Sequence, residues 1–156
     1  MAKTKPWEIL NLSCKQDLSS SARIILSQRL ESLLSSINSY FTEVSIENLH
    51  QLRISLRRLR YPMELFLKCF NRKKYLDFCK IISSLQKLSG NVRDLDILKH
   101  NMQSFFKKDK SKTEEFNFNK IDVKKDKLQS NLKLELMKFI HGKELKNFTK
   151  LINYQI

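Results

Sequence analysis

The sequence predicts an all-α protein, built as an antiparallel bundle of four to five helices joined by short turns. Three observations lead to this fold class. Apolar residues recur at helical spacing along the chain rather than at the alternating spacing of half-buried strands. The 156 residues include only two glycines and two prolines, so hairpin and turn signals are few. Hydrophobic residues make up 41% of the chain, which is enough for one core in one globular domain.

The chain is expected to begin with an irregular arm, residues 1–16, followed by a first helix from about residue 17 to 41. Asp17 or a serine of the 19–21 run can cap this helix, because a side-chain oxygen there can accept a hydrogen bond from a free backbone N–H. The apolar face of the helix comprises Ile25, Leu26, Leu30, Leu33, Leu34 and Ile37.

The second helix, expected from about residue 46 to 70, carries the strongest functional signal. Pro62 lies inside it and is predicted to kink it near residues 58–61, because proline lacks a backbone donor. At about 100° per residue, one narrow stripe carries four potential cations: His50, Arg53, Arg57 and Arg60. The opposite side is apolar and includes Leu52, Leu56, Leu59 and Met63. Such a helix is amphipathic, with an almost purely basic polar face.

A third helix is predicted over about residues 73–88, with Gly90 as its stop because glycine readily adopts the left-handed conformation of a helix end. Asn91 is then expected to cap a fourth helix. Asp94 and Asp96 would lie in its first turn, where carboxylates complement the helix dipole.

Residues 107–122 are expected to form a charge-rich connection without helical periodicity. The last helices are predicted at about 123–140 and 144–155. The helical domain therefore covers residues 17–156.

The net charge of +14 is unevenly distributed. Residues 1–48 contain five basic and five acidic groups, whereas residues 49–90 contain ten basic and two acidic groups, and residues 91–156 contain fifteen and nine. The excess begins at the Arg-rich helix, which indicates a located surface for an anionic partner such as nucleic acid, an anionic membrane or a phosphate polymer. The alternative is that the stripe is only a solvated helix face, although such a face normally mixes charges of both signs.

Other classes of site and location are disfavoured. Cys14, Cys69 and Cys79 are widely spaced and form no C-x-x-C pair, so reduced thiols are expected rather than a disulfide framework or a zinc site. The N-terminus lacks the apolar stretch of a signal peptide, and no apolar run approaches the roughly 20 residues that span a bilayer. A soluble, cytoplasmic protein without cofactor or metal is therefore expected.

Two segments, HQLRISLRRLR and the later LSGNVRDLDIL, together resemble the CHAD family, the conserved histidine α-helical domain. The family pattern is H-x-x-R-x-x-x-R-R-L-R, followed some thirty residues later by L-G-x-x-R-D-x-D. The first motif is filled at every position by His50, Arg53, Arg57, Arg58, Leu59 and Arg60. The second is matched by Leu88, Arg93, Asp94 and Asp96, with Ser89 inserted before Gly90. The resemblance covers about residues 20–106.

The resemblance implies a helical bundle that binds inorganic polyphosphate through a basic surface and is not itself a catalyst. It also implies an association with polyphosphate granules or with an enzyme that acts on phosphate polymers. Carried over by position, the expected polyphosphate contacts are His50, Arg53, Arg57, Arg58, Arg60 and Arg93. Lys80 and Lys87 are weaker additions, based on their charge and heptad spacing. Family members usually contain two such repeats, whereas this chain has one clear copy, so pairing of two chains as a homodimer is a hypothesis.

Nucleic-acid binding and an adaptor role for a phosphate-polymer enzyme remain as alternatives. No stacking platform accompanies the basic stripe, because Phe66, Phe70 and Phe105 lie on apolar faces. Catalysis would need a nucleophile or a metal site, and the candidate carboxylates Asp94 and Asp96 diverge at i,i+2 on a helix. A non-catalytic polyphosphate binder is therefore the predicted function.

Overall fold

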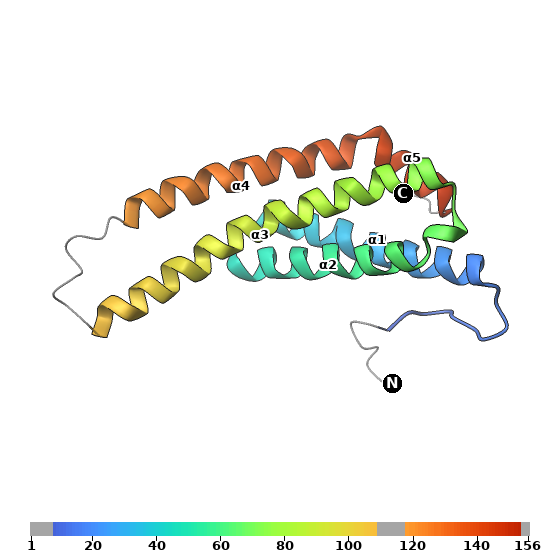
Figure 1. Cartoon of the computed structure of the whole chain (residues 1–156), viewed down its shortest axis with the longest axis horizontal. Helices are drawn as coiled ribbons and strands as arrows, with labels where there is room; N and C mark the ends of the chain where they lie inside the picture. The colour runs from blue at the N-terminus through green and yellow to red at the C-terminus, as the bar shows by residue number, and fades with distance from the viewer. Residues whose placement is uncertain (1–7, 109–117, 154–156) are drawn as a thin grey trace.

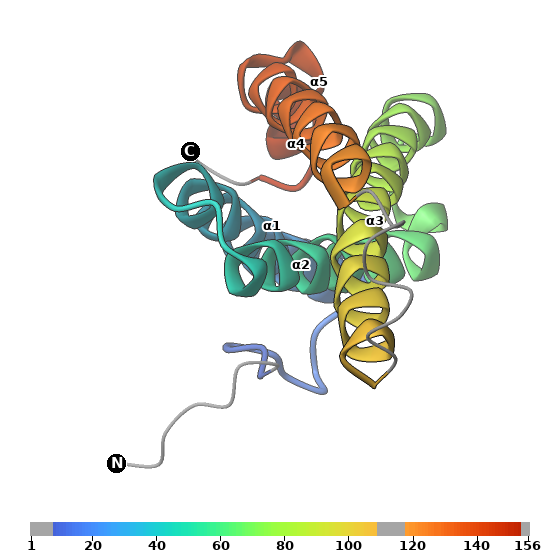
Figure 2. The same cartoon turned by 90° about the vertical axis from the view of Figure 1, so that its left-hand side faces the viewer.

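The computed structural model describes residues 8–108 and 118–153, and all regular structure in these ranges is helical. The elements are α1 (Leu18–Thr42), α2 (Ile46–Leu65), the short 3-10 helix η1 (Leu67–Cys69), α3 (Arg72–Lys108), α4 (Phe118–His141) and α5 (Lys143–Leu151). Helices α1 and α2 form a hairpin, the long α3 runs along α2, and α4 returns along α3 (Figure 1). The view along the bundle shows α4 and α5 above the α1–α2 hairpin, with α3 along one side of both (Figure 2). The predicted all-α bundle is confirmed.

The starts of the first two helices follow from their caps. A side-chain oxygen of Asp17 accepts a hydrogen bond from the Ser20 N–H at 2.5 Å, and the Ser45 hydroxyl oxygen accepts one from the Asn48 N–H at 3.1 Å. Both contacts satisfy a backbone donor that the first helical turn leaves free. The hydrogen bonds from Ser20 also lower the pKa of the Asp17 carboxyl. Helix α1 therefore begins where the sequence predicts.

Helix α2 begins at the predicted residue but ends at Leu65, so its expected continuation to residue 70 is wrong. Pro62 is accommodated in its last turn. Beyond it, Phe66 is buried, and Leu67 and Phe70 pack against the core through η1 and the bend that follows. Burial of these three apolar side chains at the turn outweighs one more turn of helix.

The predicted break at Gly90 is also wrong, because α3 is one continuous helix of 37 residues. No glycine in the described ranges has a positive φ, and Gly90 lies in the helix interior. A glycine there costs about 0.5–1 kcal/mol relative to alanine. The buried side chains Leu85, Ser89 and Val92 continue one packed face past it, and this packing keeps the helix intact. Asp96 consequently lies in mid-helix rather than in a first turn.

The connection between α3 and α4 is shorter than the predicted 107–122. Helix α3 extends to Lys108, and α4 begins at Phe118, five residues before the predicted start at 123. The rings of Phe106 and Phe118 meet edge to face with their centroids 6.0 Å apart, and Ile121 is buried. These apolar contacts stabilise the additional N-terminal residues of α4. The remainder of the connection, residues 109–117, lies outside the described residues.

The two ends of the chain also depart little from expectation. Helix α5 ends at Leu151 rather than at 155, and residues 154–156 lie outside the described residues, as do residues 1–7. Residues 8–16 contain no helix, and the Leu10 backbone exchanges two hydrogen bonds with the Gln28 side chain, at 3.0 and 2.8 Å. The irregular arm is thereby attached to α1.

The core is formed by leucine-rich faces of all five α-helices and a set of stacked aromatic rings. Phe78 of α3 stacks on Phe148 of α5 with centroids 3.9 Å apart and planes within 4°. All three cysteines are free, and burial raises the pKa of the Cys79 thiol to about 11. Within the described residues, no helix has a segment sufficiently long and apolar to cross a membrane.

An ion pair with little exposure joins α3 to α4. The Nζ of Lys125 lies 2.5 Å from a carboxylate oxygen of Asp96, and only 6% of the Asp96 side chain is exposed. Next to it, Lys99 contacts both carboxylate oxygens of Asp122 at 2.6 and 2.8 Å. Asp96 of the second motif therefore helps to hold α3 and α4 together.

Replacing Asp96 by alanine is expected to lower the free energy of unfolding by about 2 kcal/mol. The change leaves the Lys125 ammonium without its partner, and the cost stays below that of a fully buried pair because Lys125 can reach water. Urea denaturation measures the effect. Asp94→Ala, an identical change at an exposed position of the same helix, is the control and is expected to be nearly neutral.

Candidate anion-binding site

The orientation of α2 is fixed by its apolar side, which buries Leu52, Leu56, Leu59 and Met63 completely. The opposite side of the helix therefore faces solvent. His50 and Arg57 are exposed there, and Arg53, between them, is half-exposed. The stripe predicted from the sequence is thus retained for these three residues.

These three side chains surround an open hollow of about 180 Å³ between α2 and α3. Its lining consists of His50, Arg53, Ile54 and Arg57 from α2 and Gln86 from α3. Within the described part of the chain, neither Arg53 nor Arg57 forms an ion pair or a hydrogen bond with another side chain. The hollow therefore concentrates positive charge, and its lining contains no carboxylate that would offset it.

Arg60 belongs to the same stripe but has partners of its own. Its Nε lies 2.7 Å from a carboxylate oxygen of Glu64, and its Nη1 donates to Oε1 of Gln86 at 3.1 Å. The hydrogen bond to Glu64 raises the pKa of the Arg60 guanidinium. Arg60 thus contributes little uncompensated charge, and instead it holds Gln86 at the edge of the hollow.

Arg58 does not line the hollow, and its charge acts on Arg29 of α1 instead. Burial, followed by the proximity of the Arg58 charge, lowers the pKa of Arg29 on α1. The two guanidinium groups therefore lie close together on the α1–α2 side, apart from His50 and Arg53.

The predicted contacts on α3 are dispersed. Lys80 is exposed, lies 3.6 Å from Asp77, and lines a different hollow, between α3 and α5. Lys87 is exposed and lines none of the hollows described here. Arg93 is half-buried and lies two turns beyond Gln86, on the same side of α3. Of these three, only Arg93 falls near the line of the α2–α3 groove.

The sequence profile of the CHAD domain family matches residues 4–103. The chain belongs to the CHAD family. The family is associated with polyphosphate binding, and the matched region contains both motifs, all of α1 and α2, and most of α3. No curated protein and no solved structure matches the chain.

The two CHAD motifs have different structural roles. The first motif supplies His50, Arg53 and Arg57 to the hollow. The second supplies Asp96 to the ion pair with α4 and leaves Asp94 exposed. Sequence reasoning missed Gln86, because a single glutamine outside both motifs gives no signal until α3 is known to lie beside α2.

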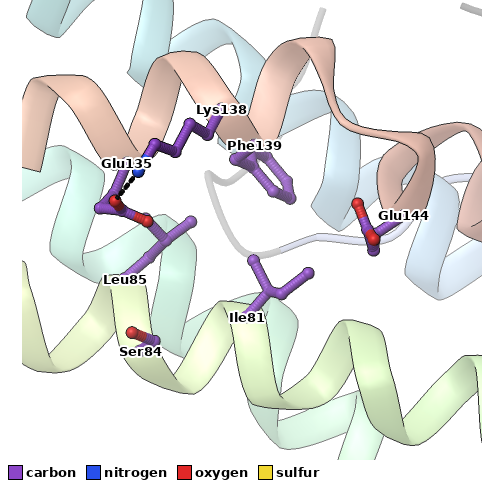
Figure 3. Close-up of a pocket in the computed structure, with 7 residues that line it drawn as sticks. All are labelled: Ile81, Ser84, Leu85, Glu135, Lys138, Phe139 and Glu144. Atoms are coloured by element: carbon purple, nitrogen blue, oxygen red, sulfur yellow. Dashed lines mark hydrogen bonds and ion pairs between the residues drawn. The ribbon is translucent and has the colours of Figure 1, made fainter.

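A larger hollow of about 290 Å³ lies between α3, α4 and α5 (Figure 3). Its lining includes two carboxylates, Glu135 and Glu144, and one cation, Lys138. The Lys138 ammonium is already 2.7 Å from Glu135. The charge balance there disfavours an anion, so the smaller hollow on α2 is the better candidate site.

Proposed function

We propose that this CHAD protein binds inorganic polyphosphate, without cleaving it, at the hollow between α2 and α3. The observation that carries the proposal is the convergence of His50, Arg53 and Arg57 on one open hollow without a neutralising carboxylate. Like charges this close repel one another unless an anion lies between them. A guanidinium group can grip two phosphate oxygens at once, which suits Arg53 and Arg57 to a phosphate polymer.

Non-catalytic binding fits the lining of the hollow, which comprises basic, aliphatic and amide side chains and no carboxylate or thiol. Phosphate-cleaving metal sites use carboxylates to hold the ion. We propose that the protein acts in the cytoplasm as a binder or adaptor at polyphosphate granules, with a phosphate-polymer enzyme as its partner. Release of phosphate from polyphosphate on addition of magnesium or manganese ions would overturn the non-catalytic part.

A titration with long-chain polyphosphate at two salt concentrations tests the proposal. Affinity is expected to fall steeply with salt, because each phosphate that the protein neutralises releases a condensed counterion, as in nucleic acids. Competition with single-stranded and duplex DNA at equal total phosphate separates the two polyanions. If DNA displaces polyphosphate readily, nucleic-acid binding is the better assignment.

The same titration tests the assembly of the protein. The chain carries one copy of the His/Arg motif, and we propose that two chains pair so that two hollows act on one polymer. One polymer segment per two chains at saturation is the expected stoichiometry. One segment per chain would remove the pairing and leave a single-hollow binder.

A further inference from the structure

Gly90 stands in the middle of α3 without a structural reason for a glycine. A glycine in a helix interior destabilises the helix relative to alanine, and the usual physical reasons for one are a positive φ or close packing. Gly90 has no positive φ. A Cβ built on it would meet nothing within 4 Å outside its own helix backbone and chain neighbours. The missing side chain therefore leaves open space that the fold itself does not use.

Helix geometry places this open space next to the candidate site, one turn beyond Gln86 of its lining. On α3, Gly90 follows Gln86 by one turn and is rotated from it by about 40°, and Arg93 follows after nearly one more turn, within about 20° of Gln86. Helix α2 runs antiparallel beside them, since Arg60 contacts Gln86 and Met63 contacts Tyr75. Gly90 thus lies on the α3 wall of the groove, between Gln86 and Arg93, and adds no side chain to it.

Gln86 is already oriented for a ligand in this groove. Its carbonyl oxygen accepts the hydrogen bond from Arg60, so its amide N–H groups remain as donors. The groove then has cations on the α2 side and the amide donors of Gln86 on the α3 side, and Gly90 and then Arg93 follow Gln86 along that helix. Two walls of donors with a gap along one of them suit an extended chain of phosphates better than a compact anion.

We infer that Gly90 provides the clearance in which a polyphosphate chain lies lengthwise along the α2–α3 groove. The inference rests on the proposed function and specifies the path of the polymer. A phosphate chain held by Arg53 and Arg57 passes over Gly90 and reaches the donors of Gln86 and Arg93. Any larger side chain at position 90 would occupy that path.

Two substitutions at this position separate clearance from stability. Gly90→Ala is expected to raise the melting temperature by about 1–4 °C, because alanine favours the helix and meets no neighbour. Gly90→Leu is also compatible with the helix, but it is expected to weaken binding of long-chain polyphosphate by about tenfold or more, as for the loss of one charge-assisted hydrogen bond. Circular dichroism and isothermal titration measure the two effects.

The matched control is Asn91→Leu, which adds leucine at an exposed neighbouring position about 100° around the helix and should leave binding unchanged. If Gly90→Leu does not fold, Gly90→Met gives the same test with a more flexible side chain. Equal binding by the folded variant and the unsubstituted protein would overturn the clearance, while the proposed function would stand. Failure of the unsubstituted protein to bind would instead overturn the proposed function. If Gly90→Leu binds polyphosphate as well as the unsubstituted protein but changes its oligomeric mass, the space at Gly90 accommodates a second chain. That result would also contradict the inference.

Discussion

Replacing Arg53 and Arg57 together by alanine is expected to weaken polyphosphate binding by about a hundredfold. Both residues line the hollow, and each guanidinium can make charge-assisted hydrogen bonds of roughly 1.5–3 kcal/mol to phosphate oxygens. The dependence of affinity on salt should also become shallower, because fewer counterions are released on binding. Titration of both proteins at two salt concentrations measures the affinity and the slope.

The control for this variant removes the same charge elsewhere. Arg72→Ala/Lys73→Ala also lowers the net charge by two, at exposed positions at the start of α3. If binding depends only on overall charge, the two double variants will lose affinity equally, and the assignment to the hollow is then refuted. A much larger loss for the Arg53/Arg57 variant supports a located site.

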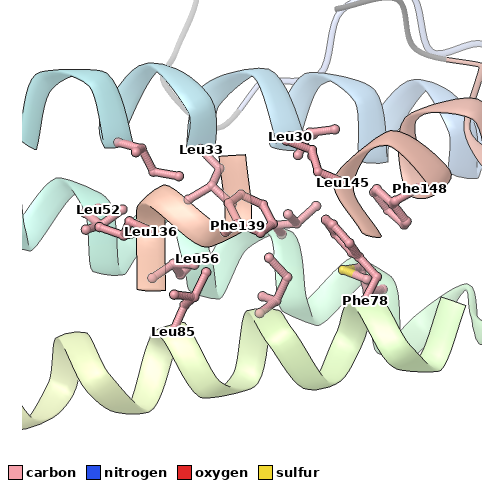
Figure 4. Packing of buried hydrophobic residues seen from close by; sticks show 14 of the residues in the cluster. Leu30, Leu33, Leu52, Leu56, Phe78, Leu85, Leu136, Phe139, Leu145 and Phe148 are labelled. Atoms are coloured by element: carbon pink, nitrogen blue, oxygen red, sulfur yellow. The ribbon is translucent and has the colours of Figure 1, made fainter. Parts of the chain in front are cut away.

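Replacing Phe78 by alanine is expected to lower the free energy of unfolding by about 3–5 kcal/mol, the usual cost of removing a buried aromatic ring. Phe78 is 1% exposed and packs between Phe148 of α5 and Phe139 of α4 (Figure 4). Loss of the ring leaves a cavity where three helices meet. Urea denaturation gives the magnitude, and hydrogen exchange should show α5 losing protection first.

Phe105→Ala is the matched control for this substitution. It removes the same ring from the same helix at a position that is 56% exposed, so the apolar face predicted for Phe105 is wrong. Its expected cost is below about 1 kcal/mol, because little apolar area returns to water. A cost as large as that of Phe78→Ala would mean that Phe105 is covered by something other than this chain.

Much of the fold was predictable because local signals and packing agree. Asp17 was predicted to cap the first helix and does so, and the second helix begins at the predicted residue 46. At Gly90 the two kinds of information conflict. The local preference of glycine favours a helix end, whereas the buried face formed by Leu85 and Val92 continues the helix. That outcome depends on contacts with other helices, which no local pattern reveals.

The basic stripe was also predictable, but its division into paired and unpaired cations was only partly so. The pairing of Arg60 with Glu64 follows a spacing of i,i+4, and that of Lys80 with Asp77 a spacing of i,i+3, which the sequence contains. The direction of Arg58 depends on where α1 lies, and the contribution of Gln86 depends on where α3 lies. Both require the tertiary arrangement.

The two ion pairs between α3 and α4 restrict how these helices can align. Asp96 faces Lys125 and Lys99 faces Asp122, so the order of charges is reversed from one helix to the other. Sliding α4 by about one turn in one direction would oppose Asp96 to Asp122, and sliding it the other way would oppose Lys99 to Lys125. Each slip replaces attraction by repulsion. The α3–α4 pair therefore has one electrostatically favoured register. This register determines the position along α3 at which α4 ends and α5 begins.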